Sequence, residues 1–518
     1  MLNSKSVKAR FFVSFASNAL RALLSFATGL ILARGLAPAG YGDLAFLLGS
    51  FVAIRSLLDL GTSNAFYTFI SQERRPLKYY TYYFSWLCAQ FLLTAAVIFA
   101  VFPDELISRV WLGHARGVIL LAFSASFLQQ QVWQTVNQVG EAARDTLKVQ
   151  LLNVSLTLVY LLGAGALAWS GSISVPAVLG FMIALYLVFS ALAVLILLGG
   201  AKKIEAPGPR VTLAEMFGQY RKYCSPLILL SVIGFAHDFA DKWLLQFFGG
   251  SGQQGFYQVA FQFSTVSILA TASMLNIFWK EISEASKLGD TKRIAALFGK
   301  VSRGLYMVGA VISGFLIPWS AEILGALLGK AYAPAGLVFS LMLFYPVHGS
   351  LGQIAGTMMF AGERTKQYLA VSAFFMLLSL PVSYLLQAPV GAVFLPGLGL
   401  GALGLALKMV LLNIACVNVM LWVVARNNGW KFEWAYQAGG LALALAGGYL
   451  ARGAAAAVFP GHATEAWTGL LPALAVSGTL YAAFVGWAFW LRPGLIGRTR
   501  SELRDDLGKL GTYLRGRI

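Results

Sequence analysis

Long apolar segments alternate with short polar ones along almost the whole chain. Each apolar segment has at least the ~20 residues that an α-helix needs to cross a hydrocarbon core of ~30 Å. The pattern predicts fourteen membrane-spanning helices, and this even number places both termini on one side of the membrane. The predicted bounds are 11–33, 43–70, 79–102, 117–140, 146–169, 173–197, 223–248, 256–279, 303–328, 335–360, 367–392, 396–424, 434–458 and 466–491.

Polar residues interrupt the first two predicted helices near mid-span. A charge at that depth costs roughly 3 kcal/mol or more unless it faces protein or water. On the second helix Arg55 and Asp59 lie four residues apart and share a face. We interpret both helices as lining a hydrated cavity; a buried ion pair with small-residue helix packing is the alternative. The first helix has polar residues at steps of four and three: Ser14, Asn18, Arg21, Ser25 and Thr28.

Three further predicted helices carry polar or charged residues. The seventh has two pairs spaced four apart, His237 with Asp241 and Asp238 with Lys242, whereas the twelfth has Lys408 alone. Lys408 fits a structural contact as well as a substrate contact. The fourth has a single-face stripe whose amides could bind sugar hydroxyls or form interhelical hydrogen bonds. That stripe is Gln130, Gln134, Asn137, Glu141 and Arg144.

Composition supports a polytopic membrane protein and explains the net charge. Hydrophobic residues make up 58% of the 518 and charged residues only 12%, against about 25% in a soluble protein. The net charge of +18 would suggest nucleic acid in a soluble protein. The predicted helices, however, place 30 of the 39 Lys and Arg residues on one side, which the positive-inside rule makes the cytoplasm. We therefore expect cytoplasmic termini and no nucleic-acid partner. The three cysteines have no metal-ligand spacing, so neither a metal site nor a disulfide framework is predicted.

An internal repeat predicts the domain organisation. GLAPAGYGDLAF (35–46) follows the first predicted helix and GSGQQGFYQVAF (250–261) follows the seventh, with Gly40 aligned to Gly255 at an offset of 215. Six helices separate the copies, so both have the same orientation. We expect an all-α integral membrane protein with two parallel six-helix lobes and two additional C-terminal helices. The predicted parts are lobes 1–200 and 223–425, a basic cytoplasmic linker 201–222, helices thirteen and fourteen within 426–491, and a basic cytoplasmic tail 492–518.

Two basic segments are predicted to lie on the cytoplasmic membrane surface. Residues 280–300 and the tail from Arg492 combine basic residues with apolar residues at helical spacing. Such helices bind anionic lipid headgroups, so membrane lipids are expected partners.

The sequence resembles a known family in several places. LILARGLAPAGYGDLAFLLGSF (30–51) followed by LLDLGTSNAFYTFIS (57–71) is similar to the opening of bacterial polysaccharide and O-antigen flippases. These belong to the multidrug/oligosaccharidyl-lipid/polysaccharide exporter superfamily. Further similarities are Asp241-Lys242 with Gly255-Phe256-Tyr257, and LPGLGLGALGLAL (395–407). The resemblance covers most of the chain, including its number of helices.

The resemblance implies a transporter without catalytic residues. Its substrate would be an undecaprenyl-pyrophosphate-linked oligosaccharide, moved across the bacterial inner membrane for surface polysaccharide and lipopolysaccharide O-antigen assembly; other polysaccharide assembly proteins are implied partners. We expect Arg21 and Arg55 to engage the diphosphate, because guanidinium groups match phosphate oxygens. The expected substrate-binding residues are Asn18, Arg21, Arg55, Gln130, Gln134, Asn137, Lys242 and Lys408.

Energy coupling and three alternative functions remain open. GALLGKA (325–331) falls short of a P-loop, so no ATP site or other cofactor is predicted and an H⁺ or Na⁺ gradient is the expected energy source. The candidate ion-coupling residues are Asp59, His237, Asp238 and Asp241, because buried carboxylates and histidines shift their pKa readily. The alternatives are a cation-coupled drug antiporter, a lipid II flippase, and a membrane glycosyltransferase or polysaccharide polymerase.

Overall fold

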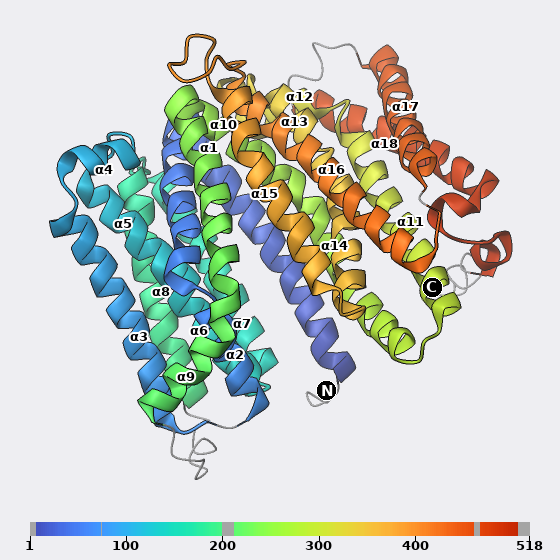
Figure 1. Cartoon of the computed structure of the whole chain (residues 1–518). Helices are drawn as coiled ribbons and strands as arrows, with labels where there is room; N and C mark the ends of the chain where they lie inside the picture. The colour runs from blue at the N-terminus through green and yellow to red at the C-terminus, as the bar shows by residue number, and fades with distance from the viewer. Residues whose placement is uncertain (1–6, 74, 199–211, 432, 460–466, 506–518) are drawn as a thin grey trace. The chain divides into compact units, whose positions relative to one another are not determined.

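The computed structural model describes residues 7–73, 75–198, 212–431, 433–459 and 467–505, and every regular element in this part is helical (Figure 1). The described chain forms two compact units: unit 1 comprises Met1–Gln258 and Met376–Leu405, and unit 2 comprises Val259–Phe375 and Ala406–Ile518. The predicted lobe bounds of 1–200 and 223–425 stay a prediction. The helices up to the middle of the chain are α1 (Val7–Asp59), α2 (Thr62–Gln72), α3 (Leu77–Ala96), η1 (Val97–Val101), α4 (Asp104–Val110), α5 (Arg116–Phe127), η2 (Leu128–Trp133), α6 (Gln134–Ala142), α7 (Thr146–Trp169), α8 (Val175–Leu198), α9 (Leu213–Cys224), η4 (Ser225–Leu227) and α10 (Ile228–Lys287).

The second half of the chain continues the all-helical pattern. Its helices are α11 (Thr291–Leu316), α12 (Ser320–Leu328), η5 (Lys330–Tyr332), α13 (Ala335–Met342), α14 (Tyr345–Ala361), α15 (Thr365–Gln387), α16 (Gly401–Asn428), α17 (Trp434–Val458), α18 (Trp467–Leu491) and η7 (Pro493–Ile496).

These helices account for the fourteen predicted spans. Among the described residues, eleven helical stretches are long and apolar enough to cross a membrane. Two of them, Ser14–Asp59 and Leu213–Thr265, each overlap two predicted spans. The remaining span, 117–140, is built from α5, η2 and α6, because the π-helix η2 interrupts it. The predicted class of an all-α, multi-pass membrane protein is therefore confirmed.

Both repeat segments form a sharp kink inside one long helix. In α1 only Ala37 leaves the helical region, with φ 55° and ψ 173°. In α10 only Gly250 does so, with φ 76° and ψ 177°. Residues 34–42, which separate the first two predicted helices, are thus helical on both sides of a single bent residue. The matching dihedral angles show that the two segments are structural repeats.

The two kinks cross each other in unit 1 at a pair of glycines. A Cβ atom on Gly42 would overlap the carbonyl oxygen of Ser251, and a Cβ on Gly255 would overlap that of Pro38. Gly42 and Gly255 each lie five residues after the bent residue of their own helix. The structural offset of the repeat is therefore 213, and the sequence alignment of Gly40 with Gly255 is wrong by two residues.

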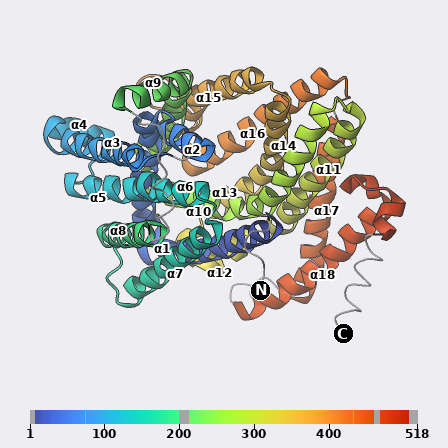
Figure 2. The ribbon, with the colours of Figure 1, turned by 90° about the horizontal axis from the view of Figure 1, so that it is seen from below.

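The rest of unit 1 packs around α1. Helix α1 contacts α5 and α7, and α8 contacts both α5 and α7 (Figures 1 and 2). The described part of the predicted linker is mostly helical, because residues 213–224 form α9. A capping box of Thr212 and Glu215 begins this helix. Tyr220 of α9 packs among aromatic residues of α2 and α3, and its hydroxyl accepts a hydrogen bond from Tyr79 at 3.1 Å.

Unit 2 is built around α11. This helix packs against α14 and α17, and α17 packs against α18. Gly314 and Gly448 allow the close approach of α11 and α17, because a Cβ on Gly448 would overlap the carbonyl oxygen of Gly314. Residues 280–300 are helical except for a break between Lys287 and Thr291, because they form the end of α10 and the start of α11. Their position on the membrane surface stays a prediction. The tail beyond residue 505 and linker residues 201–211 lie outside the described residues.

Candidate functional site

Of the two predicted cavity arginines of unit 1, Arg55 contacts the π-helix η2 directly, and Arg21 interacts electrostatically with Tyr186, which η2 contacts. Arg55 donates a hydrogen bond from Nη1 to Oε1 of Gln130 at 3.2 Å. Arg21 lies 3.5 Å from Oδ1 of the exposed Asn18 and within electrostatic range of Tyr186. The Tyr186 hydroxyl in turn accepts a hydrogen bond from Gln129 at 2.9 Å. Short π-helical segments occur often at functional sites. Here one directs Gln130 to Arg55 and Gln129 to Tyr186.

Asp59 has a local role that its spacing from Arg55 did not predict. Its Oδ1 accepts hydrogen bonds from the Ser63 amide at 2.8 Å and from the Thr62 hydroxyl at 3.0 Å. Its Oδ2 accepts a third bond from the Ser63 hydroxyl at 2.8 Å. Asp59 therefore caps the start of α2, and within the described residues no ion pair joins it to Arg55.

The amide stripe of the fourth predicted helix divides into two groups. Asn137 forms an interhelical network, because it accepts a hydrogen bond from Asn153 of α7 at 2.8 Å while Trp133 donates to Asn153 at 3.0 Å. For Asn137 the structure thus shows the interhelical alternative. Gln130 contacts Arg55, and Gln134 is half-buried without a side-chain hydrogen bond in the described part of the chain.

The charged residues of α10 follow their four-residue spacing only in part. His237 contacts its neighbour Asp238 at 2.9 Å rather than Asp241. Asp241 is buried and accepts a hydrogen bond from Ser383 of α15 at 2.5 Å. Lys242 donates from Nζ to the Asp238 carbonyl oxygen at 3.2 Å, and its side chain lies directly against Gly49 of α1. Asp241 therefore links α10 to α15, and Lys242 packs α10 against α1, within unit 1.

Lys408 belongs to the other unit. It lies in α16, is almost completely buried, and has its Nζ 3.9 Å from the sulfur of Met409. Lys408 belongs to unit 2, whereas the other seven predicted substrate-binding residues belong to unit 1.

Buried glutamines form a further polar feature of unit 1 that the sequence analysis did not identify. Side-chain oxygens of Gln90, Gln131, Gln138 and Gln150 are buried and have no hydrogen-bond partner among the described residues. The side-chain nitrogen of Gln131 is also buried without a hydrogen-bond partner among the described residues. Buried polar atoms are nearly always hydrogen-bonded to protein or water. The Gln129–Gln131 run was the one available signal in the sequence.

A second overlooked cluster lies at the crossing of α1 and α10. The Oδ1 atom of Asp43 accepts hydrogen bonds from Ser251 at 2.5 Å and from Gln246 at 3.0 Å. The Nε2 atom of His114, in the segment between α4 and α5, lies 3.2 Å from the same oxygen. One carboxylate oxygen thus joins three segments of unit 1. The predicted topology places this cluster on the outer side of the membrane.

The His114–Asp43 contact predicts a pH-dependent stability. The hydrogen bond to Asp43 is the main cause that raises the pKa of His114 above its ordinary value. The protonated imidazole therefore stabilises the fold fully below pH ~6.5, and this stabilisation is lost as the pH rises through the raised pKa. We expect the melting temperature in detergent to fall between pH 6 and pH 9, by about 1 °C for each kcal/mol of stabilisation lost in a chain of this length.

The His114→Gln variant is the control for this prediction. Glutamine can still donate a hydrogen bond to Asp43, but it cannot titrate. We expect its melting temperature to show a flatter pH profile than that of the unchanged protein. Parallel profiles for the two proteins would contradict the assignment to His114.

Comparison with known proteins decides the family. A model of the family described as polysaccharide biosynthesis protein matches residues 7–278, more than half of the chain. The chain belongs to this family. This match confirms the resemblance that the N-terminal motifs indicated. The comparison with curated protein sequences found no match.

Solved structures show the same fold. The inward closed conformation of the lipid II flippase MurJ superposes with a TM-score of 0.67 at 14% identity, covering 93% of this chain and 98% of that one. An outward-facing MATE family multidrug resistance transporter of the MOP superfamily gives 0.53 at 13% identity, covering 81% and 95%. A MOP superfamily transporter from Pyrococcus furiosus gives 0.53 at 12% identity, again covering 81% and 95%. At these identities the likeness shows the fold alone. This polysaccharide biosynthesis protein therefore has the fold of the MOP superfamily transporters.

Proposed function

We propose that this protein flips an undecaprenyl-pyrophosphate-linked oligosaccharide from the cytoplasmic to the outer leaflet of a bacterial inner membrane. The observation that carries the proposal is the placement of Arg21 and Arg55 in the two apolar spans of α1, with Arg55 hydrogen-bonded to Gln130 of the π-helix η2. A guanidinium group can bind two phosphate oxygens at once. Two such groups, one in each of the two spans that α1 joins at its kink, suit a diphosphate, which cannot cross hydrocarbon without polar partners.

The polar interior of unit 1 supports a glycan-bearing substrate. The unpartnered oxygens of its buried glutamines are hydrogen-bond acceptors that sugar hydroxyls or water can satisfy. The family match to polysaccharide biosynthesis favours such a substrate over a small drug. It also favours an oligosaccharide precursor over lipid II, because the MurJ match at 14% identity supports a shared fold but not a shared substrate. We infer a transporter rather than a glycosyltransferase or polymerase, with both termini in the cytoplasm.

We infer that an H⁺ or Na⁺ gradient drives the movement. The His237–Asp238 pair is the best placed of the candidate ion carriers, because both side chains are half-buried in a helix long and apolar enough to cross the membrane. Asp59 is less suited, since three hydrogen bonds from Thr62 and Ser63 already engage its carboxylate. The His237→Gln and Asp238→Asn variants should lose gradient-dependent transport.

Proteoliposomes test the proposed function directly. The full-length protein is reconstituted with a fluorescent prenyl-diphosphate-linked oligosaccharide, and a membrane-impermeant quencher reports the labelled headgroups exposed on the outside. We expect the protein to make the inner-leaflet headgroups accessible, whereas a fluorescent phospholipid of equal chain length stays inaccessible. Equal rates for both lipids, or none above protein-free vesicles under either gradient, would overturn the proposal.

A further inference from the structure

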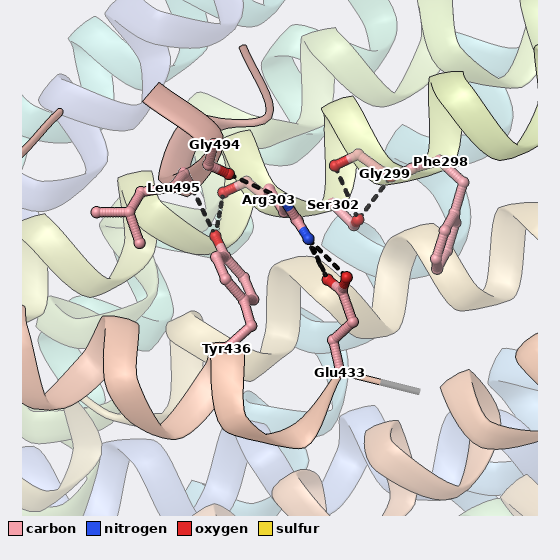
Figure 3. Close-up of polar contacts among 8 residues, drawn as sticks. All are labelled: Phe298, Gly299, Ser302, Arg303, Glu433, Tyr436, Gly494 and Leu495. Atoms are coloured by element: carbon pink, nitrogen blue, oxygen red, sulfur yellow. Dashed lines mark hydrogen bonds and ion pairs between the residues drawn. The ribbon is translucent and has the colours of Figure 1, made fainter. Parts of the chain in front are cut away.

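Unit 2 contains a pocket that the proposed transport route does not use. Its volume is about 440 Å³, within the usual range for small-ligand sites. It is formed by the first half of α11, the ends of α16 and α17 that face each other, and the segment around η7. The count of Lys and Arg residues places all of these ends on the cytoplasmic side. Figure 3 shows the polar contacts along one wall of this pocket.

One edge of the pocket is held rigidly by Arg303 of α11. Its guanidinium contacts both carboxylate oxygens of Glu433, with Nη2 at 2.6 and 2.7 Å, and donates from Nη1 to the Gly494 carbonyl oxygen at 3.0 Å (Figure 3). The Tyr436 hydroxyl donates to the carbonyl oxygens of Leu495 at 2.7 Å and of Arg303 at 3.1 Å. These bonds join α11, α17 and η7 into one wall.

The charge of the pocket is positive. Lys300, Arg303, Lys431 and Arg498 line it, and Glu433 is the one acidic residue among the described lining residues. Lys300 also contacts Glu502 at 2.9 Å, just outside the lining. Lys431 is exposed at the edge of the pocket, in the short segment between α16 and α17. Four cationic side chains against one carboxylate give the described lining a net positive charge, which favours an anionic ligand.

The inner wall is apolar, and this property selects the kind of anion. Leu351, Leu421 and Ala425 are buried side chains of α14 and α16 that reach the pocket. Phe298 and Trp430 cover another part of it, with ring centroids 5.1 Å apart. A free phosphate ion gains nothing from such a wall, whereas a lipid can place its phosphate at the basic edge and part of an acyl chain against the wall.

We propose that this pocket binds the phosphodiester headgroup and adjoining acyl chain of an anionic phospholipid of the cytoplasmic leaflet. The lipid phosphate lies near Lys431 and Arg498, and the chain passes Phe298 and Trp430. Bound there, the lipid bridges α11, the α16–α17 connection and η7. The proposal is independent of the transported substrate, because every residue of the pocket belongs to unit 2.

Native mass spectrometry of the full-length protein tests the proposal, with phosphatidylglycerol and phosphatidylcholine as probes. We expect retained phosphatidylglycerol to fall at least fivefold in the Lys431→Gln/Arg498→Gln variant. The control variant Arg221→Gln/Lys222→Gln removes the same charge from exposed residues of α9, also predicted to be cytoplasmic, and should retain the lipid. Equal losses in both variants, or equal retention of the two phospholipids, would overturn the proposal.

Two further measurements separate a lipid from a free anion. Ala295→Trp places a large side chain in the pocket without changing its charge, and we expect it to reduce phosphatidylglycerol retention at least threefold. Millimolar inorganic phosphate should leave retention unchanged. Displacement by phosphate would instead identify a small-anion site, and undiminished retention in Ala295→Trp would reject the acyl-chain contact. Elution of each variant as the same monodisperse species as the unchanged protein shows that folding is intact. If a variant fails this test of folding, Ala296→Trp is measured in its place.

Discussion

The Gly42→Leu and Gly255→Leu variants are each expected to remove most of the folded protein from the membrane. At both positions a side chain would overlap a backbone carbonyl oxygen of the other kinked helix, from Ser251 or Pro38. A flexible side chain could move aside, but a carbonyl oxygen moves only with its helix. Overpacking usually costs about 1–3 kcal/mol, and more where the backbone must shift. Separating the kinks would also pull Ser251 away from Asp43, whose hydrogen bond is 2.5 Å long.

A matched alanine pair makes this prediction specific to the crossing. Gly252 lies in the same segment as Gly255, yet a Cβ there would meet nothing within 4 Å. We expect Gly252→Ala to melt like the unchanged protein and Gly42→Ala to melt several degrees lower. Size-exclusion chromatography of a fluorescent fusion before and after heating measures both. The same melting temperature for Gly42→Ala and Gly252→Ala would show that the crossing is looser than the structure indicates.

The helices were predictable from the sequence, but the kinks were not. Hydrophobic length and the alternation of Lys and Arg residues are properties of whole segments, so local errors do not alter them. The run from Gly35 to Gly42 has three glycines and a proline, which are typical of a loop. Pro38, however, directly follows the bent Ala37. There it begins the next helix, where a missing amide hydrogen costs no hydrogen bond. Residue types alone could not distinguish this arrangement from a turn.

The repeat offset shows why matching letters misled the alignment. Gly40, Ala45 and Phe46 have identical residues 215 positions later. The structural counterpart of Gly42, however, is Gly255, because these two glycines occupy the same place in the crossing. Only close backbone approach demands glycine at both positions. That requirement arises between two segments more than 200 residues apart and leaves no signal in either one alone.

Site residues were predicted by type and depth, but their partners were not. The four-residue spacing of Arg55 and Asp59 suggested a pair on one helix face. Asp59 is the last residue of α1, so its carboxylate faces the start of α2 instead. The π-helix η2 rotates the residues that follow it relative to those before it. Residues at α-helical spacing on either side of η2 therefore do not share one face. Asp43 and His114 were missed because they are 71 positions apart and meet only through the fold.

Arg55→Ala is expected to abolish export of surface polysaccharide while the protein still reaches the membrane. Under the proposed function the guanidinium engages the substrate diphosphate. Removing one partner of a desolvated charge pair costs about 2–5 kcal/mol, which corresponds to a loss of roughly 30-fold or more in transport. Arg21→Ala should behave in the same way. Arg55→Lys keeps the charge but not the paired donors, so we expect partial export. The measurement is surface polysaccharide in a deletion strain that expresses each variant, normalised to the amount of membrane protein.

Two controls separate substrate binding from a structural role of Arg55. Arg34→Ala removes an exposed arginine from the same helix and should leave export unchanged. Gln130→Ala removes the protein partner of Arg55. If Arg55 only fastened α1 to η2, Gln130→Ala and Arg55→Ala would lower the melting temperature equally and impair export together. If Arg55 binds the diphosphate, Gln130→Ala impairs export much less than Arg55→Ala does, because the guanidinium remains available. Normal polysaccharide in both Arg21→Ala and Arg55→Ala would reject the assignment, since no desolvated anion could then depend on either arginine.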